Sequence, residues 1–376
     1  MKVLIPITIF CFAMAYLSEM NSVVEIDEVG AKRYIKKDKI AFFLMALCMA
    51  VFVGLRIRGN DTYAYINTFE RLGTGFNAVS KIDFGNISAA PGLTFVSIVL
   101  KTIGATSQDY LMIFALFTVI TYLWFIRKYS SHTFMSVYLF VTMGVYTFTM
   151  AAIKQTTAVA FLVIATDRAI NKKWLQFIIF VLIAEFFHPY AFVYLIIPFL
   201  FFKPWSDRTY AFLLGTVVVA LLLEYLMSGI FAMTESLGYD YDSNSFVGEG
   251  VNIFRVLVVW SPIILSLFVR KELQNNTDRV AQLVINASMI NAMIMFIGLF
   301  GTANYFARLA NYFLIFQTLA LPYVLNLFDK QSKSQLKTAC VILYFAYYYY
   351  GSAIANGGFD VAYSFMSIFD YIKQLI

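Results

Sequence analysis

Six basic side chains of this chain lie in or beside strongly apolar segments, where a charge costs more than it does in water. They are Arg56, Arg58, Lys154, His188, Arg255 and Arg308. Arginine binds phosphate oxygens through a planar fork of N–H donors, and lysine adds a compact point charge. Such cations, gathered at one face of a membrane, would suit an anion such as a lipid pyrophosphate. Whether the six side chains can lie close together depends on the helices that carry them.

The composition identifies the chain as a polytopic membrane protein. Of its 376 residues, 61% are hydrophobic and 13% are charged, whereas a soluble domain carries about 25% charged residues. No polar stretch is long enough for a separate soluble domain, so we expect 1–376 to form a single integral membrane domain. The net charge of +6 is spread over many short loops, which argues against a nucleic-acid partner.

Apolar segments of suitable length recur along the whole chain. A membrane-spanning helix needs about 20 mainly apolar residues, and about twelve segments qualify as candidates on this criterion. They are 3–19, 40–55, 109–126, 133–149, 151–169, 174–187, 189–202, 209–232, 251–269, 280–300, 305–327 and 336–350. The segment 91–104 is shorter and opens with Pro91-Gly92, so we expect a re-entrant or half-membrane helix there. The predicted fold is an all-α transmembrane helix bundle.

The distribution of Lys and Arg predicts the orientation of these spans. With the N-terminus outside, most of the 28 Lys and Arg residues fall in inner loops, as the positive-inside rule requires. We therefore expect an N-out, C-out protein with two larger external loops, at 56–90 and 233–250. Arg56, Arg58, Arg255 and Arg308 then lie together on the outer side, against the general bias, which favours a functional role for them.

The densest polar motif runs from Gly54 to Tyr65 (GLRIRGNDTYAY) and begins where the second predicted span ends. Its two arginines can clamp phosphate oxygens, and Asp61 can orient an arginine or accept a proton from a sugar hydroxyl. An interfacial pair of snorkelling arginines, with Asp61 as a helix cap, would explain the same residues. Both interpretations are open at this stage.

Further polar residues mark the ends of other predicted spans. Lys154-Gln155 lies near the outer start of one span, and His188 follows another. Glu185 lies three residues before His188, so the two could share a helix face and relay a proton. His132 falls in an inner loop, and we assign it no role. Glu224 is the only clear charge in the middle of a span and is the best single feature in favour of a transporter.

Some residue types are suited to binding a sugar, and several familiar cofactor-binding motifs are absent from the sequence. Aromatic faces stack on sugars and amides bond hydroxyls, so we assign Tyr65, Gln155 and Asn252 to glycan binding. The chain has no P-loop, no G-x-G-x-x-G, no H-E-x-x-H and no C-x-x-C pair, so we expect no cofactor and no metal.

Taken in order, these motifs resemble those of the EpsG family of exopolysaccharide and O-antigen polymerases, which are Wzy-like membrane glycosyltransferases. The resemblance runs from about residue 40 to 325. Its marks are Gly54–Arg56, Gly59–Tyr65, Pro91-Gly92, Lys154-Gln155, Phe187-His188, Gly250–Asn252, Arg255, Phe306–Leu309, Tyr312-Phe313 and Pro322. Two positions depart from the family pattern. Lys154 stands where Arg is usual, and Ala90 stands where Glu often precedes the Pro-Gly.

The resemblance implies an enzyme that joins oligosaccharide repeat units carried on undecaprenyl pyrophosphate, with O-antigen, capsule or exopolysaccharide as product. It implies a multi-pass protein of the bacterial inner (plasma) membrane that works on the outer face. Partners would be the lipid-linked oligosaccharide, membrane lipid, a chain-length regulator and other assembly proteins. Asp61 or His188 would serve as catalytic base. The pyrophosphate would be bound by Arg56, Arg58, Lys154, Arg255 and Arg308.

Two other functions remain open. A flippase for lipid-linked oligosaccharides needs the same anionic headgroup site, but it should carry charges along a path through the bilayer. A membrane glycosyltransferase that uses a lipid monophosphate sugar commonly has paired acids in its first outer loop. The loop here offers Asp61 and the more distant Asp83.

Overall fold

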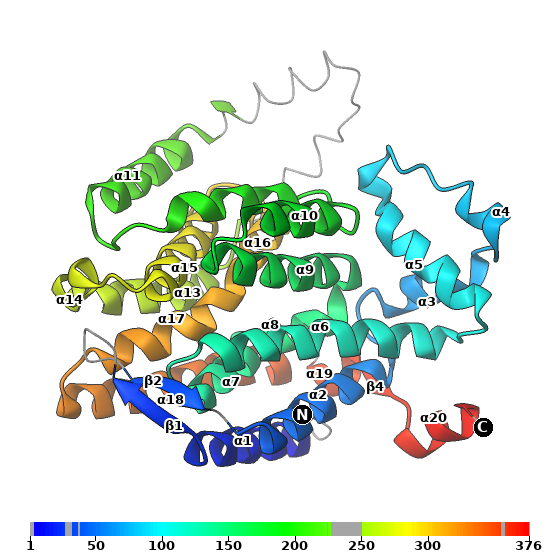
Figure 1. Cartoon of the computed structure of the whole chain (residues 1–376), viewed down its shortest axis with the longest axis horizontal. Helices are drawn as coiled ribbons and strands as arrows, with labels where there is room; N and C mark the ends of the chain where they lie inside the picture. Colours follow the sequence, from blue (N-terminus) through cyan, green and yellow to red (C-terminus); the bar gives the residue numbers. More distant parts are fainter. Residues whose placement is uncertain are drawn as a thin grey trace. The chain divides into compact units, whose positions relative to one another are not determined.

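The structure is a computed structural model that describes residues 4–26, 32–36, 38–223, 225–226, 250–354 and 358–375. Helices carry most of these residues, and the strands form only two short pairs (Figure 1). Contacts divide the chain into two compact units. Unit 1 comprises Met1–Glu25, Arg33–Leu195 and Thr338–Ile376, and unit 2 comprises Ile26–Lys32 and Ile196–Lys337.

Most helices belong to unit 1. Its elements are α1 (Leu4–Met20), α2 (Ile40–Gly54), β3 (Arg56–Arg58), α3 (Thr62–Arg71), α4 (Phe76–Val79), η1 (Ile87–Ala89), α5 (Pro91–Thr102), α6 (Ser107–Tyr129), α7 (Thr133–Thr142), α8 (Val145–Ala151), α9 (Ile153–Ile170), α10 (Trp174–Glu185), η4 (Tyr350–Ile354), α19 (Phe359–Ala362), β4 (Ser364–Phe365) and α20 (Ile368–Leu375).

Unit 2 is smaller and contains α11 (Asp207–Leu221), α13 (Ile253–Phe268), α14 (Arg270–Asn275), α15 (Arg279–Ile297), α16 (Ala303–Asn311) and α17 (Leu314–Asn326). The remaining elements have residues in both units. These are β1 (Val23–Ile26), β2 (Lys32–Lys36), the 3₁₀ helix η2 (Ala191–Leu200) and α18 (Lys330–Tyr349). Glu224 and nearly all of the predicted loop 233–250 lie outside the described residues.

An all-α arrangement of apolar helices is confirmed, whereas the number of about twelve spans is not. By length and composition, α6 and α15 can each cross a membrane, and α7 with α8 make a third span if this pair, bent by 46°, counts as one. Shorter apolar helices of 10–17 residues supply further segments. The predicted spans are interrupted at residues that break helices. Gly144, with φ of 81°, separates α7 from α8, and Pro189 follows the end of α10.

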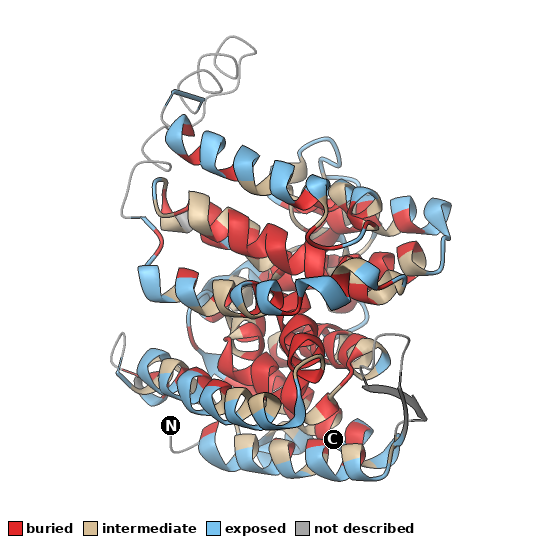
Figure 2. Ribbon diagram, turned by 90° about the vertical axis from the view of Figure 1, so that its left-hand side faces the viewer, coloured by how far each residue is buried: buried red, intermediate tan, exposed pale blue. Residues whose placement is uncertain are grey.

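Large apolar side chains are exposed on several helices, as expected where a helix contacts lipid rather than water. Figure 2 shows buried residues on the inner faces of the helices and exposed residues on the outer faces. Leu175 of α10 and Leu221 of α11 are each 76% exposed, and Leu214 is 67% exposed. These outward faces fit a membrane protein.

Four helices of unit 1 share one end. α6 packs against α2 and α9, and α9 packs against α10. α6 and α9 run in the same direction, because Lys128 and Tyr129 near the end of α6 both bond Asp167 near the end of α9. Gly54, at the end of α2, lies against Met112 in the first part of α6, and a short turn leads from α9 back into α10. The ends of α2 and α10 therefore lie with the starts of α6 and α9, at what we call the site end of unit 1.

Two glycines allow close backbone contact at the site end. A Cβ at Gly54 would lie 2.4 Å from Met112 Sδ. The Gly92 N–H donates to Phe186 O at 2.8 Å, and a Cβ at Gly92 would lie 2.9 Å from Phe186 Cβ. The predicted short helix at 91–104 is confirmed as α5, which starts at Pro91 and docks on the end of α10. Its depth in a membrane stays a prediction.

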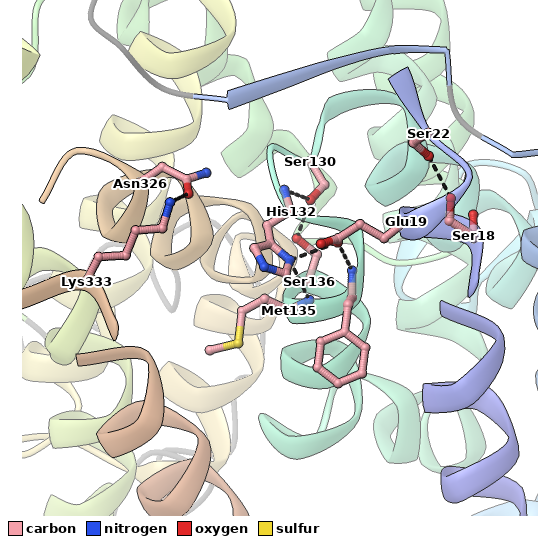
Figure 3. Close-up of polar contacts among 10 residues, drawn as sticks. Ser18, Glu19, Ser22, Ser130, His132, Met135, Ser136, Asn326 and Lys333 are labelled. Atoms are coloured by element: carbon pink, nitrogen blue, oxygen red, sulfur yellow. Dashed lines mark hydrogen bonds and ion pairs between the residues drawn. The ribbon is translucent and has the colours of Figure 1, made fainter. Parts of the chain in front are cut away.

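At the opposite end of unit 1, the Glu19 carboxylate joins α1 to α7. His132 is the N-cap residue of α7, and its Nδ1 lies 2.8 Å from Glu19 Oε2 (Figure 3). The same carboxylate oxygen accepts the Phe134 N–H at 2.7 Å. Glu19 thus satisfies a free N–H of the first turn of α7. His132, to which the sequence assigned no role, has a structural one.

Unit 2 is held together by buried amides on α15 and α17. Gln317 Nε2 lies 3.0 Å from Val259 O, from Ser288 O and from Asn291 Oδ1. Asn291 Nδ2 donates to Ala310 O at 2.7 Å. These bonds connect α13, α15, α16 and α17, so they fix the helices that carry Arg255 and Arg308.

Gly298 is the point where the start of α13 and the start of α16 meet. Val251 N–H donates to Gly298 O at 2.7 Å. A Cβ at Gly298 would lie 2.6 Å from Val251 Cγ2 and 2.8 Å from Phe306 Cβ. Only a residue without a side chain lets both segments approach this closely.

We predict that Gly298→Ala destabilises the protein by about 1–3 kcal/mol, because its new methyl group must displace two packed segments. The measurement is the thermal unfolding temperature of the purified protein in detergent. Gly215→Ala in α11 is the matched control, since a Cβ there meets nothing within 4 Å, and helix propensity makes it neutral or slightly stabilising. Equal unfolding temperatures for the two variants would contradict the assigned contact.

Candidate functional site

Arg56 is the most deeply buried cation of the predicted site. It opens strand β3 just after α2, and its side chain is only 1% exposed. Nη1 donates to Val53 O at 2.7 Å, whereas the buried Nε has no hydrogen-bond partner. No carboxylate of the described residues forms an ion pair with Arg56. The proposed snorkelling role is therefore wrong for this arginine, because its guanidinium does not reach solvent.

Tyrosines from three different parts of the chain lie close enough to this guanidinium to interact with it electrostatically. Arg56 interacts electrostatically with Tyr110 of α6, Tyr363 of the C-terminal segment and Tyr65 of α3. Burial lowers the pKa of Arg56 to about 10, so the group is still cationic at neutral pH. The result is a buried positive charge with phenolic hydroxyls nearby and an unused N–H donor.

The backbone at Arg56 is fixed by the start of α6. Gln108 Nε2 donates to Gly54 O and lies 3.4 Å from Arg56 O. Tyr110, two residues along α6, stacks on Phe69 of α3 with ring centroids 4.8 Å apart. These contacts hold α2, α3 and α6 around the arginine and leave its side chain little freedom.

Lys154 reaches the same region from α9. Its backbone N–H donates to the Tyr65 hydroxyl at 3.4 Å, and its side chain is half-buried. The N-cap residue of α9 is Ala152, which has no side-chain acceptor for the free N–H groups of the first turn. An uncapped helix start carries partial positive charge and attracts anions. The structure thus joins Arg56, Tyr65 and Lys154, which the sequence analysis took from three separate segments.

Three other predicted residues of unit 1 lie in less direct positions. Arg58 is exposed, and in the β3–β4 pair it stands opposite Ser364. Asp61 occupies the N-cap position of α3, but its exposed side chain makes no capping bond. Gln155 is buried, with 2% exposure, so its side chain faces protein rather than a solvent-exposed sugar.

His188 lies beyond the end of α10, at the site end of unit 1. Because α10 ends at Glu185, the expected shared helix face of Glu185 and His188 is wrong. Glu185 Oε2 instead accepts the Phe192 N–H at 3.1 Å. The His188 ring is half-buried, with its centroid 5.5 Å from that of Tyr190.

The predicted residues of unit 2 form a second group. Asn252 is the N-cap residue of α13, and its Oδ1 accepts the Phe254 N–H at 2.8 Å, so this oxygen has a structural use. Arg255 is half-buried in the first turn of α13, and Arg308 is exposed on α16. The contacts at Gly298 bring the starts of these two helices together.

The expectation that all six basic residues share one pocket stays a prediction, since they belong to two units. Within the described part of the chain, no three His, Cys, Asp or Glu side chains group as a metal site. The metal-independent reaction likewise stays a prediction.

Sequence reasoning missed Gln108, Tyr110 and Tyr363. The first two are polar or amphipathic residues at the start of a long apolar helix, and this placement was a usable signal. Tyr363 had none, because only the β3–β4 pairing brings it to the arginine. Its partner in that region, Asn60, donates to the Tyr363 hydroxyl at 2.6 Å.

Comparison with known proteins identifies the family. No curated protein and no solved structure matches the chain. The sequence model of the EpsG family matches residues 39–369, which is nearly the whole chain. This match confirms the resemblance seen in the motifs. The chain is a membrane protein that belongs to the EpsG family, the family of Wzy-like polymerases.

Proposed function

We propose that this protein is a polysaccharide polymerase that joins undecaprenyl-pyrophosphate-linked oligosaccharide repeat units. The reaction takes place on the outer face of the bacterial inner membrane. Family membership supports a polymerase-type membrane glycosyltransferase. The observation that carries the choice of an anionic substrate is Arg56, a buried guanidinium whose Nε has no partner, and which pairs with no carboxylate, among the residues that the structure describes.

An unpaired buried cation is costly, because its desolvation is not repaid by a counter-ion. Proteins keep such unfavourable groups mainly at functional sites. A bound anion would supply the electrostatic stabilisation that the missing counter-ion does not. The surroundings of Arg56 fit an anion of several oxygens. They offer tyrosine hydroxyls and, through Tyr65, the uncapped start of α9.

The proposed reaction transfers a glycan from one lipid carrier to another. The bond between the anomeric carbon and the pyrophosphate oxygen breaks, and the electron pair leaves with the lipid pyrophosphate. A hydroxyl at the non-reducing end of a second repeat unit attacks the anomeric carbon and loses its proton. Negative charge grows on the leaving group, and Arg56 with Lys154 would stabilise it. Preorganised stabilisation of this kind is commonly the largest single contribution to catalysis.

Two residues are candidates to accept the proton of the attacking hydroxyl. Asp61 is exposed and interacts electrostatically with Tyr363, one of the tyrosines near Arg56. His188 lies at the same end of the α9–α10 pair as Lys154. Either could act as general base once a sugar is bound, and Tyr65 is the better-placed of the predicted glycan contacts.

Arg58, Arg255 and Arg308 are the remaining candidates to bind pyrophosphate oxygens; Arg58 belongs to unit 1, and Arg255 and Arg308 belong to unit 2. Gln155 and Asn252 are weaker glycan candidates, because Gln155 is buried and the Asn252 Oδ1 accepts a backbone N–H of α13. Membrane lipid, a chain-length regulator and other polysaccharide assembly proteins are the partners that this function would require.

We predict that Arg56→Gln lowers polymer formation at least about a hundredfold, the usual loss for one preorganised donor to a developing anion. The variant should unfold at the same temperature as the wild type or higher, because it removes an uncompensated buried charge. Complementation of a deletion strain, read on a polysaccharide gel, gives the activity. Thermal unfolding in detergent gives the stability.

Arg71→Gln is the matched control, since Arg71 is an exposed arginine at the end of α3, in the same predicted external loop, and this variant should make polymer normally. Arg56→Lys keeps the charge but loses the planar fork, so we expect an intermediate defect. A wild-type chain-length distribution in Arg56→Gln would refute the leaving-group role.

A separate prediction concerns the arginines of unit 2. Arg255→Gln and Arg308→Gln should each shorten the polysaccharide while the protein stays in the membrane, because each would remove positive charge from the pyrophosphate. The readouts are the same gel and the amount of protein in the membrane fraction. Arg270→Gln serves as the control, since Arg270 is exposed at the start of α14. Normal polymer in both variants would confine the anion site to unit 1.

The deletion strain itself separates polymerase from flippase. Loss of a polymerase leaves single-repeat material at the cell surface, because repeat units still cross the membrane. Loss of a flippase leaves no surface material. The first result is expected here, and the second would overturn the proposed function.

A further inference from the structure

The arginine strand β3 obtains its partner from the far end of the chain. β4 pairs with it in antiparallel fashion, with Arg56 opposite Phe365 and Arg58 opposite Ser364. The Met366 N–H donates to Leu55 O at 2.8 Å. We call residues 358–371 the C-terminal strap. It covers the segment that holds the buried guanidinium.

Aromatic stacking attaches the strap to the end of α2. Phe365 stacks on Phe52 with ring centroids 4.3 Å apart, and Phe359 stacks on Tyr363 at 4.5 Å. Farther along, the Tyr371 hydroxyl donates to Asp109 Oδ1 at 2.7 Å, in the first turn of α6. The contacts with α2 and α6 fix the position of the strap, so the strap belongs to the site end.

Tyr363 is the residue of the strap that faces the arginine motif. Its hydroxyl accepts the Asn60 Nδ2–H at 2.6 Å, and it interacts electrostatically with Arg56. Its ring fills the space above Gly59, where a Cβ would lie 2.1 Å from Tyr363 Cδ1. Gly59 also has φ of 141°, a conformation that favours glycine. The turn after β3 is therefore shaped to admit this ring.

The O–H of Tyr363 is a hydrogen-bond donor with no acceptor among the described residues. A phenol has one O–H donor and can also accept. In the described residues the oxygen accepts from Asn60, and the Tyr363 proton has no acceptor. The nearby Arg56 Nε–H also has none. One donor from β3 and one from the C-terminal strap, neither with an acceptor among the described residues, thus lie in the same region of the site end.

We propose that Tyr363 is a further substrate-binding residue, whose O–H donates to the same anionic leaving group that Arg56 binds. This inference rests on the proposed function and extends it. The C-terminal strap carries Tyr363 to the site, and Asn60 orients its hydroxyl. Phosphate oxygens carry several lone pairs, so one oxygen anion can accept from the guanidinium and the phenol together.

The test compares Tyr363→Phe with Tyr371→Phe. Tyr363→Phe keeps the ring that fills the space above Gly59 and stacks on Phe359, and it loses only the hydroxyl. The rate is measured with purified protein and the lipid-linked repeat unit extracted from the deletion strain. We expect kcat/KM to fall roughly tenfold to a hundredfold, the range for one hydrogen bond to a charged group, with the unfolding temperature unchanged. Asn60→Ala should give a smaller fall.

Tyr371→Phe removes a hydroxyl of the same strap whose proton already has an acceptor, Asp109 Oδ1, so it should leave kcat/KM unchanged. Tyr363→Phe with wild-type kcat/KM, beside an inactive Arg56→Gln, would overturn this inference and leave the proposed function standing. Wild-type activity in Arg56→Gln would overturn both. A fall in Tyr363→Phe activity that is matched by a lower unfolding temperature would assign Tyr363 a structural role only, and would also overturn the inference.

Discussion

The site end of unit 1 depends on one constraint, the burial of a guanidinium that has no counter-ion within the described part of the chain. Arg56 satisfies one N–H on Val53 and leaves Nε unpaired. Such a group persists only where the surrounding structure determines its position. Gln108 fixes the backbone on one side, Tyr110 lies on α6, and the C-terminal strap closes the other side. The burial of this charge is unfavourable, and the contacts of its neighbours hold it in place.

Broken helices make this arrangement possible inside an apolar protein. Non-helical backbone is tolerated at membrane depth only where protein or water satisfies its polar groups. The chain supplies such partners at two of its breaks. Gly92 donates to Phe186 O where α10 ends, and Val251 donates to Gly298 O where α13 begins. Because Gly92 and Gly298 have no side chains, the two segments at each place come close enough for their backbones to form hydrogen bonds. Polar ends of helices can then be grouped without leaving N–H and C=O groups unsatisfied.

Sequence reasoning grouped several candidate residues of unit 1 correctly, but it placed the ends of the helices less well. The motif at 54–65 and Lys154 were identified from charge in apolar surroundings, and the structure joins them through Tyr65. Local signals also identified α5, because Pro is favoured at the first position of a helix, where Pro91 stands. Hydropathy was a poorer guide to helix ends, since an apolar run continues through breaks at Gly144 and before Pro189. For that reason, Glu185 and His188 were wrongly placed on one helix face.

The amino-acid sequence by itself determined the membrane class, the helical character, the family and the cationic motif. These follow from composition, periodicity and local motifs, which act over short stretches of chain. Only the tertiary structure decided that Arg56 is buried and unpaired while Arg58 is exposed, and that Tyr110 and Tyr363 lie beside Arg56. Burial and pairing are properties of segments that are distant in sequence. The β3–β4 pair makes this plain, because no local preference of either short strand specifies its partner.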